Sequence, residues 1–139
     1  MTAQPDCIFC AIVAGSAPSE TVFEDERTLA FLDVNPATDG HTLVVPKAHA
    51  ADLFELEDPD AAAVWRTVRH VAAGIRDALE PDGLNLLQGN GRAAFQSVFH
   101  LHVHLVPRWA DDGIRLPWVP RPGDRARIAQ VAGMLRPAL

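Results

Sequence analysis

The stretch Val98-Phe99-His100-Leu101-His102-Val103-His104-Leu105-Val106 places a histidine at every second position from 100 to 104. Side chains alternate between the two faces of a β-strand, so the three histidines share one face and the aliphatic residues share the other. We therefore predict a strand over 98–106, closed by Pro107, with its aliphatic face in the core. The histidines would then form a rigid row, spaced about 7 Å apart along the strand.

Outside this strand, the sequence divides into short strand-like and helix-like segments. The longest periodic segment runs from about residue 60 to 79, where apolar residues recur every three or four positions, as on one face of a helix. We also predict helices over 7–14 and 124–135 and strands over 21–24, 28–33, 41–45 and 84–87. Strands joined by short links around one long helix indicate an α+β domain with an antiparallel sheet of about five strands.

The composition is that of one ordinary globular domain. The chain has 139 residues, of which 48% are hydrophobic and 22% charged, enough apolar material for one core. A formal net charge of −6 argues against a general nucleic-acid or membrane-surface binder, which needs a basic face. No stretch is apolar enough to span a bilayer, and the N-terminus lacks the features of a secretion signal. We therefore expect a cytoplasmic protein with neither nucleic acid nor membrane as a partner.

A row of three histidines favours chemistry over packing. Each buried imidazole needs a polar partner, so three on one face are hard to explain as core residues. Neutral imidazole is a nucleophile near neutral pH, and its attack on phosphorus gives a labile P–N bond. A second histidine on that face can contact the phosphoryl oxygens as charge develops. A metal site made from the whole row is the main alternative, which the spacing alone does not exclude.

The two cysteines, Cys7 and Cys10, lie one helical turn apart. In a reducing compartment such a pair is more often a metal or redox element than a disulfide. Two thiolates at this spacing can converge on one ion, and a tetrahedral zinc would need two further ligands. The alternative is a pair of ordinary reduced cysteines buried in an apolar helix.

The segment from Phe95 to Arg108, which contains the row, closely resembles the signature of the histidine-triad (HIT) superfamily, His-φ-His-φ-His-φ-φ. Residues 31–36 and 40–49 are similar to the nucleotide-binding strands of that family, and residues 7–10 to the opening helix of many bacterial members. The resemblance covers roughly residues 7–108. His104 stands where the nucleotidyltransferase branch carries glutamine, so the chain resembles the hydrolase branches, typified by Hint and Fhit.

The resemblance implies catalytic roles for individual residues. His102 would be the nucleophile that forms a nucleotidyl intermediate, His104 would hold phosphate oxygens, and His41 would support the row. Gln96 and Ser97 would contact the phosphate or the leaving group. The implied catalytic set is His102, His104, His41 and Ser97.

The resemblance also implies a nucleotide pocket. Asp33 would bind the ribose hydroxyls, and a purine base would lie against Ile8, Phe9, Phe31 and Val34. For the two phenylalanines, simple core packing is an equally weighted alternative. The implied nucleotide-binding set is Ile8, Phe9, Phe31, Asp33, Val34, Asn90, Gln96, Ser97, His102 and His104.

Members of the superfamily that carry the cysteine pair complete a zinc site with two histidines. The corresponding positions here are His49 and His100, so the resemblance implies a closed, structural site made of Cys7, Cys10, His49 and His100. Such a site would pin the N-terminal helix to the strands behind the active site and leave His102 free for chemistry.

One position departs from the family pattern. The residue eleven before the first triad histidine usually carries an amide side chain near the phosphate, and here it is Gly89. Gln88 and Asn90 flank it, and we expect one of them to take its place.

Together these features predict a single HIT domain over 1–139, with a core at about 7–108 and a C-terminal extension at about 109–139. The predicted activity is hydrolysis of nucleoside phosphoramidates or dinucleoside polyphosphates. The alternatives are a nucleotide-binding regulatory module with little turnover and a zinc-stabilised interaction protein with an idle triad. The resemblance further implies a homodimer with one continuous sheet.

Overall fold

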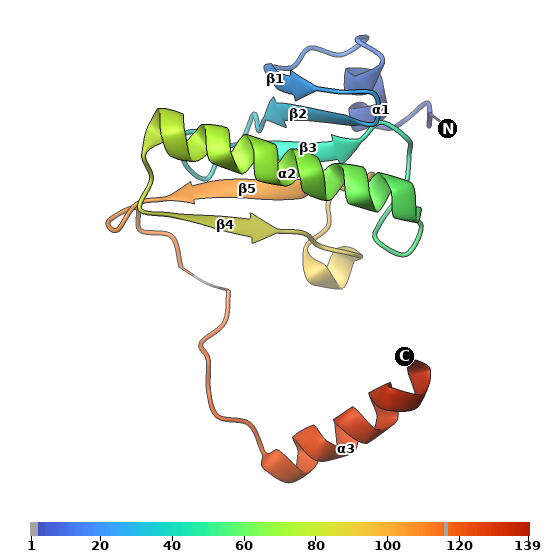
Figure 1. The fold of residues 1–139 in the computed structure, drawn as a ribbon, viewed down its shortest axis with the longest axis vertical. Coiled ribbons are helices and arrows are strands. Elements are labelled where there is room, and N and C mark those ends of the chain that lie inside the picture. Colours follow the sequence, from blue (N-terminus) through green and yellow to red (C-terminus); the bar gives the residue numbers. More distant parts are fainter. Residues whose placement is uncertain (1–2, 116) are drawn as a thin grey trace.

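A computed structural model describes residues 3–115 and 117–139. Its centre is an antiparallel sheet of five strands in the order β1-β2-β3-β5-β4, with a long helix lying across one face (Figure 1). The α+β architecture predicted from the sequence is confirmed. The elements in chain order are α1 (Ile8–Val13), β1 (Thr21–Glu24), β2 (Thr28–Leu32), β3 (Thr42–Pro46), α2 (Asp58–Leu79), β4 (Gly83–Leu87), η1 (Arg92–Ala94), β5 (Val103–Arg108), α3 (Arg125–Leu135) and η2 (Arg136–Ala138).

The sheet separates two hydrophobic clusters. On the face covered by α2, Val44 and Val103 pack with the apolar stripe of that helix. On the other face, Leu43 packs with Phe9 of α1. Directly opposed residues in an antiparallel pair share a face, so His104, which pairs with Leu43, lies on the α1 face. The topology thus places the histidine side chain away from the long helix.

The ends of α2 follow from local sequence. Pro59 occupies the first turn, where its missing N–H costs nothing, and Asp58 and Asp60 place negative charge at the positive end of the helix dipole. Arg27 donates to Asp60 at 2.7 Å, which ties the helix start to the β1–β2 turn. Glu80 adopts a left-handed conformation at φ 49° and ends the helix.

The strand that contains the histidine row is shorter at its start than predicted. β5 spans Val103–Arg108 rather than 98–106, because its ladder with β3 begins only at the Val44–Val103 pair. Just before that pair, the backbone N–H of Leu101 donates to the carbonyl of Ala50 at 2.7 Å. The rings of His102 and His104 lie 4.9 Å apart between centroids, closer than the rise of about 7 Å between such positions along a strand.

Pro107, which was expected to close its strand, lies inside β5, and Pro46 is the last residue of β3. Pro46 pairs with Thr28 of β2, and Pro107 pairs with Leu84 of β4. Both lie beyond the stretch over which β3 and β5 pair with each other. Each proline therefore has a strand partner on one side only, and its missing N–H faces the side without a ladder.

After β5 the chain leaves the sheet, and α3 lies apart from it in Figure 1. Arg108 holds the start of the segment that follows β5. Its guanidinium donates to both carboxylate oxygens of Asp112, at 2.7 and 2.9 Å, and to Asn85 of β4 at 2.7 Å. No residue of α3 is buried. Among the described residues, no helix is both long and apolar enough to cross a membrane.

Candidate active site and metal centre

The ring of His102 is oriented by the backbone two residues earlier. Its Nδ1 lies 2.8 Å from the carbonyl oxygen of His100. A carbonyl oxygen can only accept a hydrogen bond, so Nδ1 carries the ring proton and Nε2 carries a lone pair. The residue is 8% exposed, and its ring packs edge-to-face on Phe9 at 5.1 Å between centroids. The result is a neutral imidazole with its nucleophilic nitrogen fixed in direction.

A chain of hydrogen bonds sets the tautomer of His104. The backbone N–H of Ala37 donates to Nδ1 of His41 at 3.0 Å, so the proton of His41 is on Nε2. That Nε2 lies 2.9 Å from Nδ1 of His104 and therefore donates to it. His104 in turn carries its own proton on Nε2, which is free to donate outside the chain of hydrogen bonds. His41 thus leaves the Nε2–H of His104 available as a donor beside the His102 ring.

Asp33 lies next to these two histidines. Its Oδ2 is 3.5 Å from His41 Nε2, while its Oδ1 accepts from the backbone N–H of Asn35 at 2.8 Å. Asp33 is partly exposed, so its carboxylate can accept further hydrogen bonds from a ligand. The structure brings Asp33, His41 and His104 together, with their ligand atoms within 4.8 Å of one another.

Burial keeps these imidazoles neutral. It lowers the pKa of His102, against the opposing effects of the His100 carbonyl and the Asp33 carboxylate. The pKa of His104 falls to about 4, chiefly through burial and secondly because a proton on His102 or His41 would repel a proton on His104. Burial also lowers the pKa of His41, which Asp33 partly offsets. A neutral imidazole keeps a lone pair on one ring nitrogen, so these histidines can accept hydrogen bonds or act as nucleophiles at neutral pH.

The predicted base-pocket residues separate into two groups. Phe9 and Phe31 are buried, at 7% and 3% exposed, and belong to the hydrophobic cluster on the α1 face. Their rings meet edge-to-face at 5.4 Å, and the Phe9 ring also packs against His100 and His102. Ile8 and Val34 are 50% and 85% exposed and are free to meet a ligand.

The loop before the histidine row is held by the Gln96 side chain. Its Oε1 accepts from the Gly91 N–H at 2.7 Å, and its Nε2 donates to the carbonyls of Ala51 and Val98 at 2.6 and 3.1 Å. Gln96 is therefore engaged with the protein backbone, and the exposed Ser97 follows directly after it. The amide fixes where Ser97 stands relative to His102.

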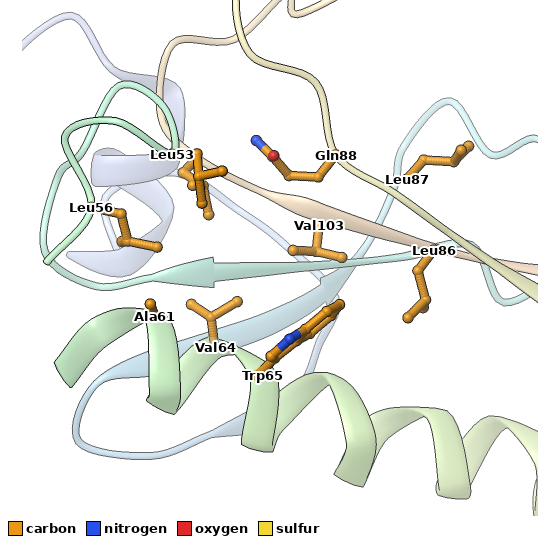
Figure 2. Close-up of a pocket in the computed structure, with 10 residues that line it drawn as sticks. Leu53, Leu56, Ala61, Val64, Trp65, Leu86, Leu87, Gln88 and Val103 are labelled. Carbon is orange, nitrogen blue, oxygen red and sulfur yellow. The ribbon is translucent and has the colours of Figure 1, made fainter. Parts of the chain in front are cut away.

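In this structure both residues that flank Gly89 make hydrogen bonds within the protein itself. Asn90 accepts from the Leu53 N–H at 2.8 Å and exchanges hydrogen bonds with the Gln88 amide at 2.8 Å. Gln88 lines an apolar groove together with Val103, on the face that α2 covers (Figure 2). A Cβ atom at Gly89 would press into the carbonyl oxygen of Ala94, so the fold of this loop requires glycine.

The four predicted metal ligands converge. Cys7 Sγ lies 3.3 Å from His100 Nδ1, and Cys10 Sγ lies 3.3 Å from His49 Nδ1 and 3.5 Å from His100 Nδ1. Zn–S and Zn–N bonds of ordinary length in a tetrahedron place sulfur and nitrogen about 3.5 Å apart. The donor set of two thiols and two imidazoles, which lie within 4.8 Å of one another, therefore fits one zinc ion.

His100 is oriented as a metal ligand by its other ring nitrogen. Nε2 donates to the carbonyl of Pro46 at 2.7 Å, so Nδ1 presents a lone pair toward the two sulfur atoms. Burial lowers the pKa of His100 to about 4, which keeps it neutral. Burial raises the pKa of the Cys10 thiol, because it disfavours the charged thiolate.

Sequence reasoning missed the backbone groups that complete the site. The Ala37 N–H, the Pro46 carbonyl and the His100 carbonyl set the three tautomers, and Ala51 holds Gln96. Every residue has such backbone groups, so no side-chain pattern marks them. The Pro36 step before Ala37 is the only local signal, because it bends the chain back toward His41.

Comparisons with known proteins agree with this geometry. Protein hit of Bacillus subtilis (strain 168) is 49% identical over 114 residues, which cover 81% of this chain and 79% of that protein. The adenylylsulfatase HINT3 of Arabidopsis thaliana is 39% identical over 120 residues, 82% of this chain and 61% of that protein.

Solved structures share the fold. A member of the HIT family from Bacillus subtilis superimposes with a TM-score of 0.90 at 42% identity, over 96% of this chain and 97% of that one. A Zn-bound histidine triad family protein from Mycobacterium smegmatis gives 0.76 at 39% identity, over 93% and 97%. The family profile of the HIT domain matches residues 14–111, which include the whole histidine row. The chain therefore belongs to the HIT-domain family.

Proposed function

We propose that this chain is a nucleotide-binding hydrolase that cleaves at an α-phosphorus through a nucleotidyl-His102 intermediate. One observation carries the proposal: His102 donates through Nδ1 to the His100 carbonyl at 2.8 Å, which leaves Nε2 as a buried, neutral, fixed nucleophile. Asp33 is partly exposed, and Ile8 and Val34 are exposed, so we propose that Asp33 binds the ribose and that Ile8 and Val34 contact the base.

The reaction has two displacements. In the first, His102 Nε2 forms a bond to the α-phosphorus while the bond to the leaving group breaks, and the leaving group departs with the electron pair. In the second, water attacks the same phosphorus and passes one proton to the Ser97 oxygen, which restores the hydroxyl, while the P–N bond breaks, which returns the pair to Nε2 and releases the nucleotide. His104 Nε2–H donates to a phosphoryl oxygen in both steps. We propose that the Ser97 hydroxyl supplies a proton to the leaving group in the first step.

The substrates that we propose are purine nucleoside phosphoramidates and dinucleoside polyphosphates. Both carry an α-phosphorus with a displaceable group, as the two-step scheme requires. The name of the adenylylsulfatase relative points to a third leaving group, sulfate, on an adenylyl group. The three substrates differ at the leaving group and share the nucleotidyl part that His102, His104 and Asp33 would hold.

We further propose that Cys7, Cys10, His49 and His100 hold one structural zinc ion. The interatomic distances fit the tetrahedron, and a relative of known structure is Zn-bound. When bound, the zinc ion supplies a closed cross-link between α1 and the segment that precedes β5. It is not a reactant, since the set leaves no ligand position open.

The test is turnover together with trapping of the intermediate. Adenosine phosphoramidate, diadenosine polyphosphates and adenylyl sulfate are incubated with the protein and with His102→Ala, and reactions are quenched midway for mass spectrometry. We expect turnover of at least one substrate, an adenylyl adduct on His102, and loss of both in the variant. Adducts on another residue would refute the nucleophile. Tight nucleotide binding without turnover would favour the regulatory module, and neither binding nor turnover would favour the interaction protein.

A further inference from the structure

Both cysteines of the chain lie at the start of α1, and their sulfur atoms face a common point. Cys7 is the N-cap residue of α1, and Cys10 lies in its first turn. The two Sγ atoms are 3.3 and 3.5 Å from the same ring nitrogen, Nδ1 of His100, and lie within 4.8 Å of each other. Two thiols at this distance can be joined to each other as well as to a shared ion.

The backbone at the start of α1 permits a bond between the two sulfur atoms. Residues three apart in a regular helix hold their Cβ atoms about 5–6 Å apart, whereas a disulfide needs about 3.5–4.5 Å. Cys7 is not helical, because its backbone is extended at φ −89° and ψ 116°. Its side chain folds over the first turn, where the Cys10 N–H donates to its Sγ at 3.3 Å. Closure of the pair therefore does not require α1 to unwind.

The two thiols differ in their access to solvent. Cys7 is half-buried, and it lines a hollow of about 530 Å³ together with Gln4, Asp6, Ile8, His49, Ala51, Ser97, Val98 and Phe99. Cys10 is only 6% exposed and is not part of the lining of this hollow. Redox-sensing cysteines are solvent-accessible and lie next to a second cysteine that resolves the oxidised sulfur. Cys7 meets the first condition, and Cys10 meets the second.

A bond between the two sulfur atoms would compete with metal binding. Zinc binds the thiolate form of cysteine, and a disulfide has no thiolate. Closure would therefore leave His49 and His100 as the only two donors of the set, too few for a closed tetrahedral site. The inference rests on the proposed zinc site at this point alone, since disulfide formation itself requires only the two thiols.

The cysteine pair is also linked to the ring of His102 by the residue between them. Phe9 lies in α1, and its ring packs edge-to-face on His100 at 5.9 Å and on His102 at 5.1 Å between centroids. A change in the position of α1 against the segment that precedes β5 would therefore alter the packing of His102.

We propose that Cys7 and Cys10 are a modification site, at which hydrogen peroxide forms a reversible disulfide. The Cys7 sulfur attacks one peroxide oxygen and the O–O bond breaks, which gives a sulfenic acid on Cys7 and one water that carries the thiol proton. The Cys10 sulfur then attacks the Cys7 sulfur, the S–S bond forms, and the S–O bond breaks to release a second water with the Cys10 proton. The two thiols lose two electrons, which the peroxide gains, and a dithiol reductant reverses the change.

Intact-mass analysis tests the disulfide directly, because the chain contains only these two cysteines. The full-length protein is treated with one equivalent of hydrogen peroxide, and zinc release is followed with a chelating dye. We expect a single-chain product lighter by two hydrogen atoms, release of zinc in step with its formation, and reversal by dithiothreitol. Disulfide-linked two-chain products, or oxygen addition without loss of two hydrogens, would overturn the proposal. The same mass change in a protein that held no zinc beforehand would support the disulfide and refute the zinc site.

A matched pair of variants tests the order of the two steps. Cys10→Ser leaves Cys7 at the hollow without a resolving thiol, and Cys7→Ser leaves only the buried Cys10. Each variant is treated with peroxide and dimedone, which traps sulfenic acid. We expect the adduct to form about tenfold or more faster on Cys7 than on Cys10, because access governs oxidation. Equal rates, or a faster reaction at Cys10, would overturn the assigned order.

The NMR signals of the histidine rings test the link to His102. Oxidation of the unmodified protein should shift the His102 ring signals. The control is His70, which lies on α2 and packs on Phe23 at 4.7 Å, and its signals should stay in place. An unmoved His102 signal in protein that carries the disulfide would overturn the link through Phe9.

Discussion

Restoring a side chain at Gly89 is expected to damage the site, even though the family pattern places an amide at this position. A Cβ atom there falls well inside van der Waals contact with the carbonyl oxygen of Ala94, and the Gln96 backbone nitrogen lies 3.6 Å away. The carbonyl must therefore retreat by about 1 Å, and a displacement of that size near a catalytic group can cost about 100-fold in rate. The displaced segment leads through Gln96 to Ser97. We expect Gly89→Ala and Gly89→Asn to lower kcat/KM by about 10- to 100-fold and stability by about 1–3 kcal/mol.

The assay is steady-state turnover of adenosine phosphoramidate together with urea unfolding. Gly74→Ala is the matched control, because a Cβ at Gly74 in α2 meets nothing within 4 Å. That change should raise stability by about 0.5–1 kcal/mol and leave turnover unaltered. If Gly89→Asn is as active and as stable as the unmodified protein, the loop does not require glycine.

Three further outcomes are expected at the site. His41→Leu removes the N–H that donates to His104 Nδ1 and should lower kcat about 100-fold. His41→Gln offers an amide N–H at similar reach and should recover part of the loss, so equal losses in the two variants would contradict the assignment of the His104 tautomer by His41. Cys10→Ser should abolish stoichiometric zinc in metal analysis and lower the Tm by about 10 °C, and an unchanged Tm would remove zinc from the structural account. The pKa of His104 lies at about 4 in the fold, against an ordinary value of 6.5, so the unfolded chain takes up this proton first as the pH falls. The contribution of neutral His104 to the free energy of unfolding is therefore present above pH 6.5 and is lost toward pH 4, by at most about 3 kcal/mol. Denaturant unfolding across this pH range should show a smaller loss of stability for His104→Asn than for the unmodified protein. The same loss in both proteins would contradict the lowered pKa of His104.

The sequence predicted the elements well where a side-chain pattern was long enough. The three-and-four spacing of apolar residues placed the long helix within two residues of its observed start, Asp58. The prediction of a strand was wrong for residues 98–102, because a strand needs a partner strand and β3 pairs with this segment only from Val103 onward. Alternation therefore located the face of His104 correctly and the start of β5 wrongly.

The site likewise has parts that the sequence predicted and parts that it did not. The convergence of Cys7, Cys10, His49 and His100 was predicted from residue type and family resemblance and is found in the structure. The fit of Gly89 against Ala94 and the turn of Ala37 toward His41 were not predicted. Both depend on which backbone atoms the fold brings together, and the residue types in the sequence do not predict those contacts. The roles of Ser97, Ile8 and Val34 remain predictions until a ligand is bound.

His100 serves two neighbours with two different parts of itself. Its imidazole faces the cysteine pair, while its carbonyl oxygen holds the ring of His102. Substitution of His100 by alanine would remove the imidazole and leave the carbonyl oxygen in place, so the variant would test only the contact with the cysteines. An ester in place of the amide bond after His100 would weaken the carbonyl as an acceptor and keep the imidazole, while also removing the Leu101 N–H that donates to Ala50. Side-chain substitution therefore tests the contact of His100 with the cysteines, and the backbone ester tests its hydrogen bond to His102.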